Sequence, residues 1–131
     1  MPLQVELVSP ERILYSGEAR AVIARTIGGG DIAFLPGHAP FIGALAVDQV
    51  IIRPVSGPDE VAAVHGGFVS VNDDRVKILS DLAELRDQID VARARRAAES
   101  AEAAARVGDD VEAEASMRRA QARLKAVGEL D

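Results

Sequence analysis

Residues 76–98, VKILSDLAELRDQIDVARARRAA, contain the point at which the character of the chain changes. Up to about Asp87 the chain is rich in Val, Ile, Gly and Pro, and beyond it Ala, Arg and Glu dominate. All six prolines lie at or before Pro58. Because proline is excluded from helix interiors, this break predicts two parts with different folds, residues 1–87 and residues 88–131.

Before the break, apolar runs of strand length alternate with turn residues. Leu3, Val5 and Leu7 alternate with polar residues, and further runs cover residues 13–15, 21–27, 50–55, 61–65, 68–71 and 76–79. Turn residues separate the runs at 16–17, 28–31, 56–59 and 72–74. Short strands broken at such intervals predict a small antiparallel β-sandwich, or a barrel, for the N-terminal part.

After the break, apolar residues recur at spacings of three and four, which predicts two helices. The first stripe is Val91, Ala94, Ala98, Ala101 and Ala105, and the second is Ala113, Met117, Ala120, Leu124 and Val127. Gly108 suits the left-handed position after a helix end, and Asp109 with Glu112 resembles a capping box that opens the second helix. A turn this short predicts an antiparallel two-helix hairpin for the C-terminal part.

The stripes of the hairpin consist mostly of alanine, which buries little apolar area. An alanine offers only a fraction of the roughly 1.5–3 kcal/mol available from burying a larger aliphatic side chain. We therefore expect a hairpin that is marginally stable alone, so that a partner or a ligand can change its position.

The composition excludes several classes of function. A net charge of -6 disfavours a nucleic-acid partner, and with no cysteine there is no disulfide or thiolate metal site. The longest stretch without charged residues, 32–47, is too short to span a membrane, so we expect no direct membrane insertion. Met1 and Pro2 lead directly into the first expected strand, and we expect no signal peptide.

Several motifs together resemble the epsilon subunit family of bacterial F-type ATP synthases. Each motif is weak alone, but all occur in the family's order across essentially the whole chain. They are VSPER at 8–12 with YSG at 15–17, LPGHAP at 35–40, HGGFVSV at 65–71, VKILSD at 76–81 and IDVARA at 89–94. One departure is Ala33, where the family has a glycine in the loop that faces the membrane ring.

The resemblance implies a non-catalytic subunit of the central stalk, which couples proton flow to ATP synthesis. The implied partners are the gamma subunit, the ring of c subunits, and the alpha and beta subunits of the catalytic head. The implied location is the cytoplasmic face of the bacterial cell membrane, as a peripheral part of the complex. The helix pair of such a subunit folds against the sandwich or extends towards the head, where it restrains ATP hydrolysis.

The resemblance also implies roles for two residues of the N-terminal part. Asp31 occupies the position of an acidic residue in the loop that faces the ring, after Gly28-Gly29-Gly30. His38 lies between two prolines, which hold the backbone of a turn rigidly. His38 is interpreted either as a structural turn residue or as a residue that contacts the ring or gamma. The glycine run lacks the lysine and the following helix of a phosphate-binding loop, so it predicts a hairpin tip.

Asp90 with Arg93 is the most specific chemical signal in the chain. An aspartate at this place predicts the N-cap of the first helix. The resemblance adds a second interpretation, an ATP site on the folded hairpin that includes Ala94, Glu84 before the box, and Arg119 and Arg123 on the second helix. The two arginines are four residues apart and share a helix face, as a polyphosphate clamp requires. Another arginine of the family site corresponds to Ser100 here.

Four basic residues gather on the second helix: Arg118, Arg119, Arg123 and Lys125. They are interpreted either as a solvated face or, from the resemblance, as a contact with acidic segments of the catalytic head.

Two other functions compete with the coupling subunit. One is a nucleotide sensor that uses the sandwich only as a mount for the hairpin. The other is a metal enzyme built on His38 and His65, which two histidines are too few to support. The sequence therefore predicts no metal and no required cofactor, and the resemblance implies ATP as a regulatory ligand beside the interpretation of Asp90 as a helix cap.

Overall fold

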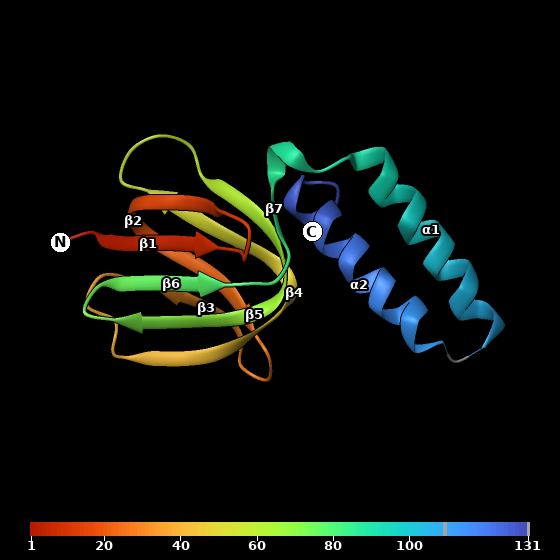
Figure 1. Ribbon diagram of the computed structural model, residues 1–131, viewed down its shortest axis with the longest axis horizontal. Helices are drawn as coiled ribbons and strands as arrows, with labels where there is room; N and C mark the ends of the chain where they lie inside the picture. Colours follow the sequence, from red (N-terminus) through yellow and green to blue (C-terminus); the bar gives the residue numbers. More distant parts are fainter. Residues whose placement is uncertain (109, 131) are drawn as a thin grey trace.

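The structure is a computed structural model that describes residues 1–108 and 110–130. Seven strands are followed by a short 3₁₀ helix and two α-helices (Figure 1). The strands are β1 (Leu3–Val8), β2 (Ile13–Thr26), β3 (Gly30–Phe34), β4 (Phe41–Pro54), β5 (Glu60–Asn72), β6 (Arg75–Leu79) and β7 (Ala83–Leu85). The helices are η1 (Arg86–Gln88), α1 (Val91–Val107) and α2 (Val111–Ala126).

The strands form a two-layered body whose sheet closes on itself. The order of hydrogen-bonded strands is β1-β6-β5-β4-β2-β3, β1 also pairs with β2, and β7 pairs with β5. All pairs are antiparallel except β1 with β6, which are parallel. The predicted N-terminal sandwich followed by a helical hairpin is confirmed, with this one parallel pair as an addition.

The core of the sandwich is mainly aliphatic. In β1 the alternating residues Leu3, Val5 and Leu7 are buried, as their spacing predicts. The largest fully buried side chain, that of Phe34, comes from β3. Because such burial is the main driving force of folding, this cluster holds the sandwich together independently of the helices. Its other buried members include Val22, Ile52, Val64, Val69, Val71, Val76 and Ile78.

Several strands are longer than the apolar runs predict. The predicted turn at Ser16-Gly17 is wrong, because both residues lie inside β2 and pair in register with Glu6 and Val5 of β1. A ladder of backbone hydrogen bonds overrides the local turn preference there. Residues 61–65 and 68–71 likewise belong to one strand, β5. The predicted hairpin tip at Gly28–Gly30 is confirmed, since Thr26 pairs with Gly30.

The start of the hairpin and the turn between its helices differ in part from the expectation. Asp90 is the N-cap of α1, where its side chain accepts a hydrogen bond from the Arg93 amide at 3.0 Å. The predicted left-handed Gly108 is wrong, because its φ of 164° is extended backbone. Asp109, the predicted cap of the second helix, lies outside the described residues. Asp110 caps α2 instead, accepting from the Ala113 amide at 3.1 Å.

The apolar stripe of α2 is as predicted. The predicted stripe of α1 departs from the buried face of the helix near its C-terminal end. Ala94 and Ala101 are buried, but Ala105 is exposed and Ala104 is half-buried in its place. A helix turns every 3.6 residues, so a stripe spaced mostly by four drifts away from its partner over several turns.

A second buried face of α2 packs on the sandwich and was not predicted. Ala122 and Ala126 contact a cluster formed by Val61 and Ala63 of β5 and by Ile89. The hairpin is therefore folded down, with α2 against the sandwich and α1 outside it (Figure 1).

Candidate functional site

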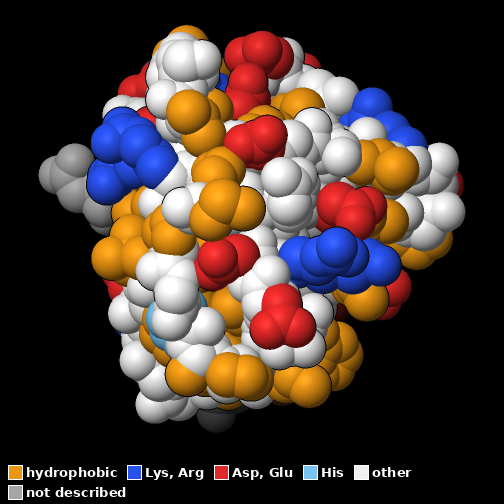
Figure 2. Space-filling model, turned by 90° about the vertical axis from the view of Figure 1, so that its left-hand side faces the viewer, with side chains coloured by type: hydrophobic (Ala, Val, Ile, Leu, Met, Phe, Trp, Pro, Cys, Tyr) orange, Lys and Arg blue, Asp and Glu red, His pale blue; other side chains and the backbone are white. Residues whose placement is uncertain are grey.

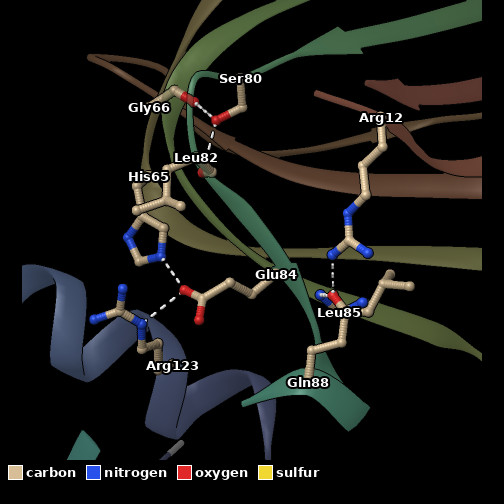
Figure 3. Close-up of polar contacts among 9 residues, drawn as sticks. All are labelled: Arg12, His65, Gly66, Ser80, Leu82, Glu84, Leu85, Gln88 and Arg123. Carbon is tan, nitrogen blue, oxygen red and sulfur yellow. Dashed lines mark hydrogen bonds and ion pairs between the residues drawn. The ribbon is translucent and has the colours of Figure 1, made fainter. Parts of the chain in front are cut away.

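The contact between α2 and the sandwich is built on the pairing of β5 with β7. Glu84 of β7 lies directly opposite Ala63, and His65 lies two residues further along β5. Residues two apart on a strand point to the same face, so Ala63 and His65 both face α2. This places the Glu84 carboxylate between His65 and the second helix (Figure 3).

Glu84 joins three elements through one oxygen. Its Oε1 lies 2.9 Å from His65 Nε2 of β5 and accepts a hydrogen bond from Arg123 Nε of α2 at 2.7 Å (Figure 3). The hydrogen bond from His65 lowers the pKa of Glu84, burial opposes this, and the bond and charge of Arg123 lower it further. Glu84 is therefore ionised at neutral pH and holds the arginine of the hairpin.

A pocket of about 290 Å³ opens next to this contact, between the start of α1 and α2. It brings together all six residues that the sequence assigns to an ATP site: Glu84, Asp90, Arg93, Ala94, Arg119 and Arg123. Gln88, Ala97 and Ser116 also line it, and the sequence pattern did not single them out. Ser100, at the place of a further family arginine, is exposed on α1 and is not among the lining residues.

The charged groups of the pocket are held by their neighbours. Arg119 donates to Glu112 Oε1 at 2.8 Å and to Ser116 Oγ at 3.0 Å, which keeps its side chain along the helix. The hydrogen bond from Arg119 also lowers the pKa of Glu112. A guanidinium has five N–H donors, so Arg119 and Arg123 retain donors for an anionic ligand beyond those they use here. Three arginines against two carboxylates leave the pocket suited to a polyphosphate.

The four basic residues of α2 do not form one face. Arg119 and Arg123 line the pocket, whereas Arg118 and Lys125 lie on a neighbouring face together with Val47 and Asp48. Lys125 Nζ is 3.0 Å from Asp48 Oδ1, and Asp48 also lies 3.9 Å from Arg25. In this folded position Arg123 and Lys125 are therefore bound to the sandwich.

Asp31 lies at the start of β3, and His38 lies beyond its other end. Asp31 is exposed near the hairpin tip, where it lies 3.6 Å from Arg25. His38 follows β3, its ring packs edge-on against Phe34 at 5.1 Å, and its amide donates to the Leu35 carbonyl at 3.0 Å. Gly37 beside it donates to Asp74 Oδ1 at 2.7 Å, which ties this loop to the turn between β5 and β6. His38 thus has the contacts of a turn residue.

The end of the sandwich away from the helices shows no single charged patch. Figure 2 shows hydrophobic side chains spread over this face among acidic and basic ones.

The two histidines have separate surroundings, His38 against Phe34 and His65 beside Glu84. Among residues 1–108 and 110–130, no cluster of three or more His, Asp or Glu side chains could hold a metal ion. Within the same residues, no helix is long and apolar enough to cross a membrane.

Comparison with known proteins identifies the family. Residues 2–86 match the family described as "ATP synthase, Delta/Epsilon chain, beta-sandwich domain". The ATP synthase epsilon chain of Streptomyces griseus is 49% identical over 125 residues, which cover 95% of this chain and 94% of that one. That of Thermobifida fusca is 50% identical over 127 residues, covering 95% and 90%.

The chain belongs to the ATP synthase epsilon chain family.

Solved structures show the same fold in chains of low sequence identity. A chain in the Euglena gracilis mitochondrial ATP synthase, described as OSCP/F1/c-ring in rotational state 1, matches with a TM-score of 0.84. The match covers 95% of this chain and 80% of that one at 23% identity. A chain from the central stalk and c-ring of the Tetrahymena thermophila enzyme matches with a TM-score of 0.56 at 18% identity. The predicted family and its role as an ATP synthase epsilon chain are confirmed.

Proposed function

We propose that this epsilon chain works in the central stalk of a bacterial F-type ATP synthase, on the cytoplasmic face of the membrane. Its sandwich, residues 1–87, binds the gamma subunit and the ring of c subunits, with Asp31 and His38 in that contact. Its hairpin, residues 88–131, is the regulatory part. The observation that carries this proposal is the match to bacterial epsilon chains at up to 50% identity over 95% of the chain.

The test is reconstitution with the ATP synthase of Streptomyces griseus after removal of its own epsilon chain. The full chain is expected to restore ATP-driven proton pumping to membrane vesicles, and residues 1–87 are expected to restore it as well. A fragment that folds but does not bind gamma would contradict the division between the two parts. Failure of the full chain to restore pumping would contradict the assignment to the stalk.

We further propose that the pocket between the hairpin helices binds ATP as a regulatory ligand. Arg93, Arg119 and Arg123 would hold the phosphates, while Asp90 and Glu84, which share the charge of the phosphates, would orient the adenine. The pocket volume of about 290 Å³ lies just below the range of about 300–1,000 Å³ typical of small-molecule sites. Since both helices line the pocket, ATP would bind only the folded hairpin and hold it down.

Calorimetry on the full chain tests ATP binding. Arg119→Ala and Arg123→Ala are each expected to weaken binding by about tenfold or more, because each removes a charge-assisted hydrogen bond. Arg106→Ala is the matched control, since Arg106 is exposed, pairs with Glu102 and lies outside the pocket. No heat and no shift in melting temperature up to millimolar ATP would contradict the proposal and leave the stalk assignment intact.

In the extended position, the basic residues of α2 would contact acidic segments of the alpha and beta subunits and restrain hydrolysis. Arg123 and Lys125 must first leave Glu84 and Asp48, so the same side chains serve either position but not both at once. Replacing Arg118, Arg119, Arg123 and Lys125 with Ala is expected to raise ATP hydrolysis by the assembled complex. Hydrolysis that stays unchanged across a salt series would count against this contact.

A further inference from the structure

His65 is the buried polar group that the proposed function leaves without a role. Only 4% of its side chain is exposed, although it is polar and lies at the contact with α2. Its Nδ1 is buried and has no hydrogen-bond partner among the described residues. Leaving a buried polar atom without a hydrogen-bond partner is unfavourable, so burying this histidine has a cost. The contact between its other ring nitrogen, Nε2, and Glu84 therefore needs an explanation.

The backbone around His65 holds the ring in place. Its amide donates to the Leu82 carbonyl at 3.0 Å. The Ser80 hydroxyl lies 2.7 Å from the Gly66 carbonyl and 2.9 Å from the Leu82 carbonyl, so its single hydrogen serves either of them (Figure 3). These contacts fix the connection between β6 and β7, and with it the position of Glu84 relative to the ring.

The contact between His65 and Glu84 fixes which of the two groups is the donor. An ionised carboxylate has no hydrogen to donate, so the hydrogen between Glu84 Oε1 and His65 Nε2 belongs to the histidine. His65 therefore donates its Nε2–H to Glu84.

We propose that His65 is a positioning residue: its Nε2–H holds the Glu84 carboxylate in the place from which Glu84 binds Arg123 and keeps α2 docked. Without this donor, one of the two bonds to Glu84 Oε1 is lost and the long side chain can turn away from the helix. Arg123 then loses its partner on the sandwich. The consequence for docking stands alone, whereas the consequence for ATP rests on the proposed function of the pocket.

The charge environment of Glu84 supports this role. His65 makes the largest contribution to the lowered pKa of Glu84, ahead of Arg123. Arg12 donates to Gln88 of η1 at 2.8 Å (Figure 3), and Arg86 of η1 donates to the Ala126 carbonyl at 3.0 Å, so two further side chains hold η1, which follows β7. Among these side chains, His65 is the one that hydrogen-bonds the Glu84 carboxylate, which faces the hairpin.

The first test uses the unmodified full chain. Nitrogen-detected NMR of the imidazole ring is expected to show a hydrogen on Nε2 at neutral pH. An Nδ1–H tautomer would overturn the proposal, because Nε2 would then have no hydrogen to donate to Glu84. This measurement does not depend on any variant folding correctly.

The second test compares two variants of His65. His65→Gln places an amide donor near the position of Nε2, whereas His65→Leu fills the space without a donor. His65→Leu is expected to raise the pKa of Glu84, to speed amide exchange in α2 by about tenfold, and to weaken ATP binding by about tenfold. His65→Gln is expected to restore most of each effect. Equal losses in both variants would overturn the proposal, because packing rather than donation would then be responsible.

A double-mutant cycle separates this role from a general one. In a Glu84→Gln background, His65→Leu is expected to change α2 exchange by less than about twofold, since its target carboxylate is absent. A full tenfold effect in that background would overturn the proposal. If the unmodified chain binds no ATP, the proposed nucleotide function fails, while α2 exchange still decides the role of His65.

Discussion

Asp90 has a structural role that is separable from any role in binding. Its carboxylate accepts from the Arg93 amide and so satisfies one of the free N–H groups at the start of α1. We predict that Asp90→Ala destabilises α1 by about 1 kcal/mol, whereas Asp90→Asn, an equally good cap, leaves it nearly unchanged. Amide exchange in α1 measures this. If Asp90→Asn keeps α1 intact but weakens ATP binding, the carboxylate also serves the ligand; an Ala variant without effect on α1 would contradict the capping role.

Glu84 makes docking of the hairpin sensitive to acid. Its pKa lies below the ordinary value of 4.5 in the docked state, because His65 and then Arg123 stabilise the carboxylate. A group whose pKa is lowered contributes stability above its ordinary pKa and loses it as the pH falls through the lowered value. We predict that α2 undocks progressively below about pH 4.5.

The matched control for this prediction is Glu84→Gln, which removes the titrating group. The variant is expected to show faster α2 exchange at neutral pH and a smaller change on acidification. The difference between the two proteins isolates Glu84 from Asp48, whose contact with Lys125 also depends on a carboxylate. An identical acid response in both proteins would exclude Glu84 as the cause.

Among the elements, β5 depends on one glycine where its partner changes from β7 to β6. Gly67 has a φ of +122°, and a Cβ built there would lie 2.1 Å from the Leu79 carbonyl oxygen. We predict that Gly67→Ala destabilises the sandwich by about 3 kcal/mol or more, through overpacking and backbone strain together. The control is Gly57→Ala, which shares a positive φ but meets no atom within 4 Å. Chemical denaturation that gives equal losses for the two variants would contradict the close approach.

The elements also show what could and could not be predicted from the sequence. The sandwich and both helices follow from period and composition, and the family resemblance points to six of the nine residues that line the pocket. The continuous course of β2 through Ser16-Gly17 does not follow from the sequence, because pairing with β1 outweighs local turn preference. The docking face of α2 is formed by Ala122 and Ala126, which lie off its main apolar stripe. Their role follows only from the structure, in which they pack against Val61 and Ala63. His65 belongs to a sequence motif, but its contact with Glu84, 19 residues away, follows only from the register of β5 with β7.

For the whole molecule, a stable sandwich carries a helix pair that is held by few contacts. The helices bury mainly alanine. The contacts that hold α2 include one small apolar cluster, Arg123 with Glu84, Lys125 with Asp48, and Arg86 of η1 with the Ala126 carbonyl. Contacts of this kind are individually weak, so the folded position is one that a ligand or a partner can strengthen or release. This property fits the regulatory role proposed for the hairpin.

Amide exchange of α2 in the full chain, with and without ATP, tests this regulatory design most directly. If ATP binds only the folded hairpin, a hundredfold excess over its dissociation constant is expected to slow exchange in α2 by about a hundredfold. Exchange in the sandwich core around Val64 and Ile78 is expected to stay unchanged. Arg123→Ala, which weakens binding by about tenfold or more, is expected to reduce the slowing at the same ATP concentration to about tenfold or less. Exchange in α2 that is the same with and without millimolar ATP would contradict a hairpin held down by nucleotide.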